Sequence, residues 1–161
     1  MRPLAAVLVA TLALAGCADP RAAQNLRIAD AFLAAQGKAP GVITLPSGLE
    51  YSVSHTGPAD GLSPRPTDQV LVLYEGRLLD GTVFDSSYKR GKPDVMTVNQ
   101  LIPAWTEALQ KMKPGDQWVL YCPPNLAYGP KGAGPIPPNS LLIFKLELLQ
   151  ILPADLSVGK G

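Results

Sequence analysis

The chain has 161 residues, and its 14 Lys and Arg against 13 Asp and Glu give a formal net charge of +1 at pH 7. These charges are scattered along the chain, which argues against a nucleic-acid partner or a polybasic membrane-binding surface. The 17 prolines and 15 glycines accompany an apolar fraction of 47%, a share that a disordered Pro/Gly-rich chain would lack. We therefore expect one folded domain with a substantial core and many turns.

The chain begins with features that are typical of an export signal. Arg2 supplies a positive charge, and a mostly apolar run covers residues 4–14. This run is shorter than the roughly 18 residues that a membrane-spanning helix needs. It ends in Leu-Ala-Gly-Cys at residues 14–17, which resembles the lipobox of bacterial lipoproteins. That resemblance implies removal of residues 1–16 and acylation of Cys17, whose acyl chains would anchor the protein to a membrane.

The alternative interpretation is an ordinary secretory signal with a chance cysteine near its cleavage site. The lipobox interpretation places the protein in the cell envelope, and Ala18 after the cysteine favours the periplasmic face of the outer membrane in a Gram-negative host. The second cysteine, Cys122, lies in an apolar stretch and is then left without a disulfide partner. We expect it to be a small buried hydrophobe rather than a nucleophile or a metal ligand.

Residues 17–46 are expected to comprise the lipidated cysteine, a tether and one short helix. Apolar residues recur at a helical spacing in this segment, namely at Leu26, Ala29, Phe32 and Leu33. Gly37 and the Lys-Ala-Pro that follows it end the pattern. A tether would hold the domain away from the membrane, and we then expect a monomer. A dimerisation helix is the alternative for this segment.

From Leu49 onward the pattern changes to strands and turns. Alternating or β-prone runs predict strands over residues 49–54, 69–79, 82–85, 95–98, 117–122 and 141–152. One amphipathic helix begins at Pro103 and ends at Pro114-Gly115, with an apolar face made by Trp105, Ala108, Leu109 and Met112. This order of elements predicts an α+β domain with a mainly antiparallel sheet, one face of which is covered by the helix.

Several kinds of chemistry find no support in the sequence. The chain has no phosphate-binding glycine loop, and its only histidine, His55, excludes a His-based triad or a multi-histidine metal site. Its position at a strand end predicts a solvated side chain. We expect no metal and no organic cofactor. An enzyme built from this chain would act by binding and shape rather than through a nucleophile.

Five short motifs then follow one another in a fixed order. They are residues 74–87 (Y-x-G-x-L-x-x-G-x-x-F-D-S-S), 100–105 (QLIPAW), 112–115 (MKPG), 123–129 (PPNLAYG) and 136–140 (IPPNS). Together they resemble the FKBP family of peptidyl-prolyl cis-trans isomerases, and residues 41–51 further resemble the bacterial members related to the macrophage infectivity potentiators. The resemblance implies a five-stranded antiparallel sheet curled around one short helix. It places the isomerase domain at residues 47–153, followed by a tail at 154–161.

The resemblance also implies a pocket between the helix and the sheet. Carried over residue by residue, the catalytic set would be Tyr74, Phe84, Asp85, Trp105, Tyr128 and Phe144. The substrate-binding set would add Met96, Leu101, Ile102, Ile136 and Arg90. The implied partners are Pro-containing polypeptides, and ligands of the FK506 and rapamycin type.

The implied activity is the cis-trans isomerisation of X-Pro bonds in exported proteins, with no proton transfer and no covalent intermediate. An FKBP-fold binding module or chaperone without turnover is the alternative. Such modules typically lack the tryptophan that forms the floor of the pocket or the tyrosine of the loop before the last strand, whereas Trp105 and Tyr128 are both present here. Two positions depart from the family pattern. Ala104 replaces a glycine beside the floor tryptophan, and Asp94 stands where some members carry an aromatic rim residue.

Overall fold

The computed structural model describes residues 20–152. The export signal, Cys17 and the tail at 154–161 lie outside the described residues. The elements in chain order are α1 (Pro20–Gln36), β1 (Val42–Thr44), β2 (Glu50–His55), β3 (Gln69–Leu78), β4 (Val83–Ser86), α2 (Ser87–Arg90), β5 (Asp94–Thr97), η1 (Val98–Gln100), α3 (Pro103–Leu109), β6 (Gln117–Cys122), η2 (Pro124–Leu126), η3 (Gly129–Lys131) and β7 (Leu142–Leu152). All the predicted strands are present, and α3 is shorter than the sequence suggested.

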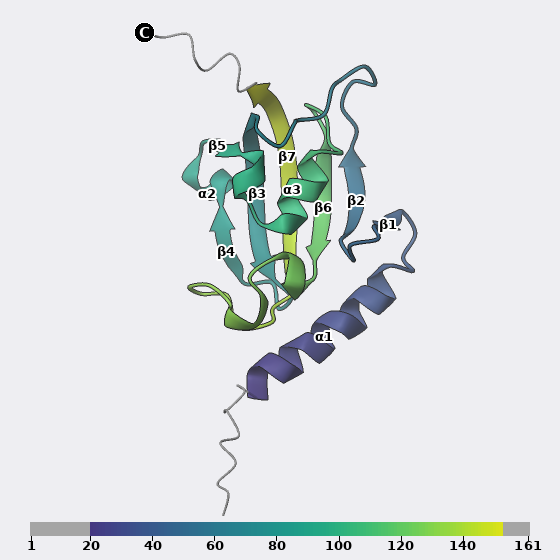
Figure 1. Ribbon diagram of the computed structural model, residues 1–161, viewed down its shortest axis with the longest axis vertical. Coiled ribbons are helices and arrows are strands. Elements are labelled where there is room, and N and C mark those ends of the chain that lie inside the picture. Colours follow the sequence, from purple (N-terminus) through teal and green to yellow (C-terminus); the bar gives the residue numbers. More distant parts are fainter. Residues whose placement is uncertain (1–19, 153–161) are drawn as a thin grey trace, which may run out of the picture.

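The strands form one antiparallel sheet in the order β1-β2-β6-β7-β3-β4, with β5 also paired to β3 (Figure 1). The described sheet has seven strands rather than five because the short β1 pairs with β2, and because α2 divides β4 from β5. The Ser86 side chain caps α2 by accepting a hydrogen bond from the backbone of Lys89, and Gly91 ends the helix in the left-handed conformation. As a result, β4 and β5 pair with different parts of the same edge of β3.

The two faces of the sheet carry different hydrophobic clusters, because successive side chains of a strand point to opposite faces. In β6, Trp118, Leu120 and Cys122 point into the main core beneath α3, whereas Val119 and Tyr121 point to the other face. From α3, the main core receives Ala104, Trp105, Ala108 and Leu109, all of them buried. The expected α+β fold, with a helix covering one face of the sheet, is confirmed.

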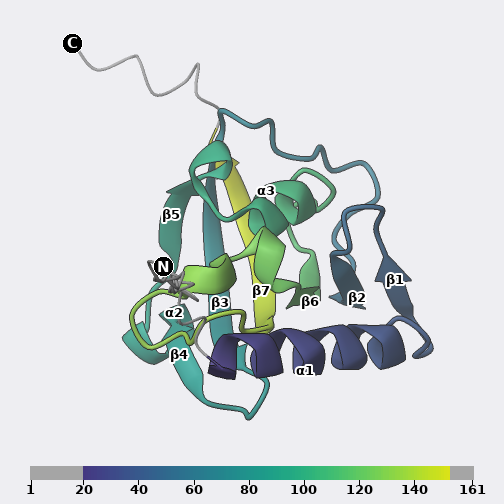
Figure 2. The ribbon, with the colours of Figure 1, turned by 60° about the horizontal axis from the view of Figure 1, so that its bottom comes forward.

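The second face of the sheet is partly covered by α1. Ala29 is 1% exposed and packs against Leu141 and Ile143, and the ring of Phe32 lies 5.9 Å from that of Tyr121. Figure 2 shows α1 spanning the domain from the β3–β4 connection to β1. The helix therefore lies on the domain instead of holding it at a distance. None of the helices within residues 20–152 is long and apolar enough to cross a membrane.

We predict that Ala29→Asp will lower the free energy of unfolding by about 2 kcal/mol, because a carboxylate must be buried without a partner or α1 must leave the sheet. Ala31→Asp is the matched control, since Ala31 is an exposed residue of the same helix. Urea unfolding and limited proteolysis within α1 would measure the difference. Equal behaviour of the two variants would show that α1 does not pack on the domain in solution.

Candidate functional site

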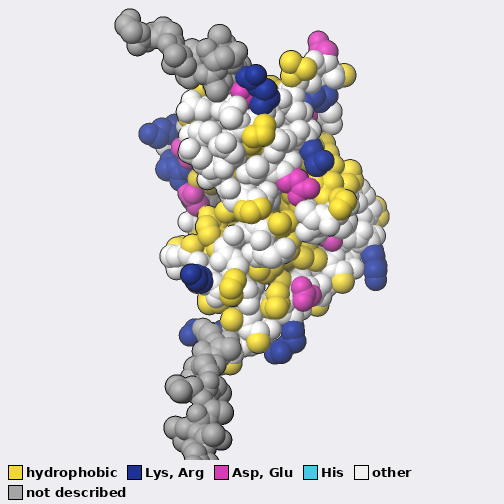
Figure 3. Space-filling model, viewed as in Figure 1, with side chains coloured by type: hydrophobic (Ala, Val, Ile, Leu, Met, Phe, Trp, Pro, Cys, Tyr) yellow, Lys and Arg dark blue, Asp and Glu magenta, His cyan; other side chains and the backbone are white. Residues whose placement is uncertain are grey.

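Nine side chains enclose a cavity of about 110 Å³ between α3 and the sheet. They are Tyr74 from β3, Phe84 and Asp85 from β4, Met96 from β5, Leu101 and Ile102 before α3, Trp105 from α3, Tyr128 from the β6–β7 connection, and Phe144 from β7. Figure 3 shows hydrophobic side chains gathered in the middle of this face of the molecule, with charged side chains mostly around them. The site is thus a small apolar hollow whose walls come from segments far apart in the chain.

Aromatic rings that meet nearly at right angles form the inner part of this cavity. The Trp105 ring contacts Tyr74 at a centroid distance of 5.0 Å and an interplanar angle of 86°, and it contacts Phe144 at 5.2 Å and 83°. Phe84 in turn meets Phe144 at 5.7 Å and 89°. Edge-to-face contacts place the electropositive edge of one ring against the face of another. Trp105 is only 4% exposed, which makes its indole the floor of the cavity.

A polar network fixes one rim of the cavity. The Tyr74 hydroxyl donates a hydrogen bond to Asp85 Oδ2 at 2.5 Å, and Arg90 Nη2 donates to the Tyr74 hydroxyl at 3.0 Å. Arg90 also forms ion pairs with Asp85 and with Asp94. Asp94 thus makes the rim more polar by binding Arg90, whose guanidinium group is held between two carboxylates and lies 5.6 Å from the centre of the Tyr74 ring.

The environment moves the pKa values of the rim groups away from neutrality. Burial, and then the hydrogen bond to Asp85, raise the pKa of Tyr74 to about 12. Burial acts to raise the pKa of Asp85, but the hydrogen bonds from Tyr74 and Arg90 outweigh it and hold that pKa below its usual range. Neither group therefore titrates between about pH 5 and 9. Tyr74 and Asp85 therefore keep a constant charge over this range and are unsuited to proton transfer.

Nine of the site residues that the family resemblance implied line this cavity, and the other two, Arg90 and Ile136, do not. Arg90 is at the rim, as described above. Ile136 does not line the cavity: its backbone forms a β-bridge with Ala133, and its side chain, 7% exposed, packs into the main core. Ala104 is fully buried in the same core, so its methyl group does not narrow the cavity wall.

Sequence reasoning gave Gly76 no role of its own, although it belongs to the first motif. A Cβ atom built at this position would lie 2.6 Å from ring atoms of both Phe84 and Phe144. The missing side chain therefore leaves room for the two rings to pack over β3. This close approach is a structural reason for the glycine that the spacing of the motif could have suggested.

Other reactive side chains lie apart from the cavity. Cys122 is completely buried, which raises the pKa of its thiol, and it behaves as the expected buried hydrophobe. His55 is exposed at the end of β2. Within residues 20–152, no group of three or more His, Cys, Asp or Glu side chains is placed to hold a metal ion.

Comparisons with known proteins give the class that this fold and cavity define. The family model for the FKBP-type peptidyl-prolyl cis-trans isomerase matches residues 61–149, which is more than half of the chain. The model for the domain amino-terminal to FKBP-type peptidyl-prolyl isomerases matches residues 11–53. The chain therefore belongs to the FKBP-type peptidyl-prolyl cis-trans isomerase family, as its motifs predicted.

Two curated relatives come from the bacterial group that the sequence suggested. The peptidyl-prolyl cis-trans isomerase Mip of Coxiella burnetii is 52% identical over 128 residues, covering 79% of this chain and 55% of the relative. The outer membrane protein MIP of Legionella longbeachae is 48% identical over 137 residues, covering 84% of this chain and 58% of the relative. The chain thus spans little more than half the length of these relatives.

Solved structures agree with this assignment. FkpA from Escherichia coli superposes with a TM-score of 0.80 at 42% identity, over 83% of this chain and 62% of that chain. A peptidyl-prolyl cis-trans isomerase from Pseudomonas syringae gives a TM-score of 0.74 at 35% identity, over 81% of this chain and 95% of that chain. The similarity therefore includes the fold as well as the motifs.

We predict that Gly76→Ala will displace the rings of Phe84 and Phe144 and lower the free energy of unfolding by about 1–3 kcal/mol, the usual cost of overpacking. Gly61→Ala is the comparison variant, because a Cβ there would approach Pro58 and Lys113 at 3.2 Å but no aromatic ring, and it should leave the ring signals unchanged. Urea unfolding gives the energies, and aromatic NMR signals report the ring positions. Unchanged ring signals in Gly76→Ala would contradict the proposed role of this glycine.

Proposed function

We propose that the protein catalyses the cis-trans isomerisation of X-Pro peptide bonds in polypeptides of the cell envelope. The observation that carries the proposal is the right-angled set of rings around the Trp105 floor, enclosed in an apolar cavity of about 110 Å³. Family membership supports the same activity. The hollow is small enough to receive a single proline ring and leave the flanking peptide outside.

The physical problem of the reaction is the loss of amide resonance. Rotation about a peptide bond passes over a barrier of roughly 18–20 kcal/mol, because the twisted amide loses its partial double bond. Water stabilises the planar amide, which is the more polar form. An apolar cavity removes that water and so favours the twisted amide, whose oxygen carries less charge. Catalysis then consists of binding the twisted state more tightly than the planar state.

Each lining group has a proposed role in holding the twisted bond. The indole of Trp105 lies beneath the proline ring, and the ring edges of Tyr74, Phe84 and Phe144 face the rotated carbonyl oxygen. Asp85 and Arg90 orient the Tyr74 ring through the hydrogen bonds of the rim. Since these groups keep a constant charge, they act by position and shape.

The peptide on either side of the proline needs hydrogen-bond partners of its own. The backbone N–H of Ile102 precedes α3 and donates to no acceptor among residues 20–152, as is usual at the start of a helix. Tyr128 is 40% exposed, and its hydroxyl is open to a ligand. We assign these two donors to the carbonyl groups that flank the X-Pro bond. The same donors would serve ligands of the FK506 and rapamycin type.

We further propose that the protein is a monomeric lipoprotein attached through Cys17 to the periplasmic face of the outer membrane. The lipobox-like sequence at residues 14–17 supports this location. A relative that is named an outer membrane protein supports it as well. Client proteins would then be exported polypeptides that fold near the membrane surface.

The full-length protein should accelerate isomerisation of a short X-Pro peptide, and FK506 should inhibit it. Tyr128→Phe should lower kcat/KM about two- to tenfold through loss of one hydrogen bond, and Trp105→Ala should lower it further. Tyr88→Phe is the matched control, because Tyr88 lies outside the cavity. The uncatalysed step takes tens of seconds, so acceleration is easily measured. A folded protein that binds the peptide without acceleration would instead be a binding module for Pro-containing segments.

Cys17→Ser should abolish lipid attachment and release the protein from the membrane fraction, because no acyl acceptor would remain. Intact mass spectrometry of the two purified proteins should show the mass of the acyl groups on the parent protein alone. Cys122→Ser serves as the control, since that thiol is buried and should not affect attachment. An unmodified Cys17 in the parent protein would leave an ordinary secreted protein as the better interpretation.

A further inference from the structure

Two asparagines join α1 to the connection between β6 and β7. Asn25 Nδ2 donates a hydrogen bond to the backbone carbonyl of Pro138 at 2.7 Å, and Asn139 Nδ2 donates to the backbone carbonyl of Ala22 at 3.0 Å. Both bonds are partly buried, and they link residues 113 and 117 positions apart in the sequence. Because one bond runs from the helix to the loop and the other from the loop to the helix, they hold the two segments in one relative position.

Asn139 also closes the loop on itself. Its backbone N–H donates to the carbonyl of Gly129 at 2.8 Å. Its φ of 52° makes it the one non-glycine residue with a positive φ in the described part of the chain, a conformation that asparagine tolerates better than most residues. The backbone of Asn139 therefore closes the loop over residues 129–139 where its two ends meet. The side chain of Asn139 joins this loop to α1.

This loop continues directly from a wall of the cavity. Tyr128 lines the cavity and is followed by Gly129, the residue that Asn139 binds. No described residue hydrogen-bonds the Tyr128 hydroxyl, and the side chain is 40% exposed. The ring position therefore depends on the backbone that carries it. At the other end of the loop, Ile136 packs in the same core cluster as Trp105 and Phe144.

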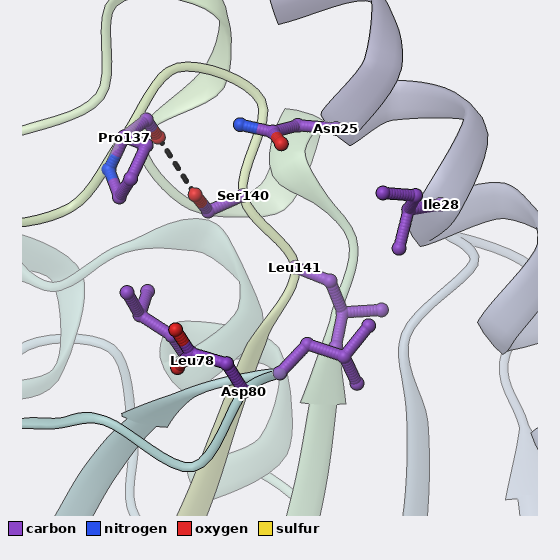
Figure 4. A pocket seen from close by; sticks show the side chains of 8 residues that line it. Asn25, Ile28, Leu78, Asp80, Pro137, Ser140 and Leu141 are labelled. Carbon is purple, nitrogen blue, oxygen red and sulfur yellow. Dashed lines mark hydrogen bonds between the residues drawn. The ribbon is translucent and has the colours of Figure 1, made fainter. Parts of the chain in front are cut away.

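Apolar packing does little to hold the loop against this half of α1. A cavity of about 370 Å³ separates them, and its lining residues are Asn25, Ile28, Leu78, Leu79, Asp80, Pro137, Ser140 and Leu141. Figure 4 shows Asn25 extending from α1 toward Pro137 and Ser140, while Ile28 lies farther along the helix. Ile28 remains 45% exposed. The two asparagine hydrogen bonds are therefore direct links across this junction.

We infer that Asn25 and Asn139 are positioning residues for the isomerase pocket. Through their hydrogen bonds, α1 holds Tyr128 in the position that substrate binding requires. The inference rests on the proposed isomerase function. Neither asparagine lines the pocket, so neither needs to touch the substrate. Their effect is to pre-organise the Tyr128 hydroxyl. Even a short displacement of this donor would weaken its hydrogen bond to the twisted peptide.

In the full-length protein, Asn25→Ala should lower kcat/KM about three- to tenfold, the range expected for a lost hydrogen bond. Alanine favours the helix, so α1 itself should remain folded. Gln24→Ala, at an exposed neighbouring position of α1, should leave turnover unchanged. Asn25→Gln, which keeps the amide donor, should restore part of the activity.

A double-mutant cycle separates positioning from general destabilisation. If Asn25 acts through Tyr128, Asn25→Ala should cost less than about twofold in a Tyr128→Phe background. Asn139→Asp is the second variant, because it keeps the size of the side chain and its tolerance of a positive φ but lacks the donor. In both variants, amide hydrogen exchange over residues 129–139 should become faster.

The outcomes distinguish the inference from the function on which it rests. An inactive parent protein would refute the proposed function and this inference together. An active parent whose turnover is unchanged by Asn25→Ala and Asn139→Asp would overturn the inference alone. The inference would also be overturned if each asparagine variant lowered kcat/KM by the same factor with and without Tyr128→Phe. The asparagines would then act independently of Tyr128.

Discussion

The nearly perpendicular packing of Trp105 against Tyr74 and Phe144 is the constraint on which the pocket depends. Trp105 meets both rings nearly at right angles, and all three side chains line the hollow. The arrangement needs α3 to approach the sheet closely, and Ala104 and Ala108 allow this because both are small and fully buried. The glycine at position 76 provides the corresponding room on β3. The floor of the site is therefore a product of core packing.

The same sheet that packs against α3 also carries α1 on its opposite face. Alternation along β6 and β7 directs one set of side chains toward α3 and the other toward α1, so both helices are held by the same strands. Tyr121 contacts Phe32 of α1 on one face of the sheet. Its neighbours in sequence, Leu120 and Cys122, lie in the main core on the other face. The amino-terminal helix and the FKBP-type fold thus form one packed unit in the described part of the chain.

The lining residues were expected from the family resemblance, which supplied the order of the short motifs and also the positions of Met96 and Phe144 outside them. The sequence also held the local signals for α2, a serine cap at Ser86 and a glycine end at Gly91, which were not used. It could not predict the docking of α1. That contact depends on pairs more than 100 residues apart, such as Asn25 with Pro138, and the apolar stripe of the helix is narrow. Ile136 was misplaced because its β-bridge to Ala133 turns the side chain into the core.

The proposed isomerase works by shape and so needs rigid walls, since it has no reacting group whose chemistry could compensate for a loose fit. Most of this pocket is rigid because its rings pack against one another and the rim is fixed by Arg90 between two carboxylates. Tyr128 is an exposed residue, whereas the other lining residues are buried or half-buried, and it receives neither kind of support. The asparagine bonds join α1 to Pro138 and Asn139, and Asn139 in turn binds Gly129, the residue after Tyr128. This chain of contacts is how a segment outside the pocket can contribute to its geometry.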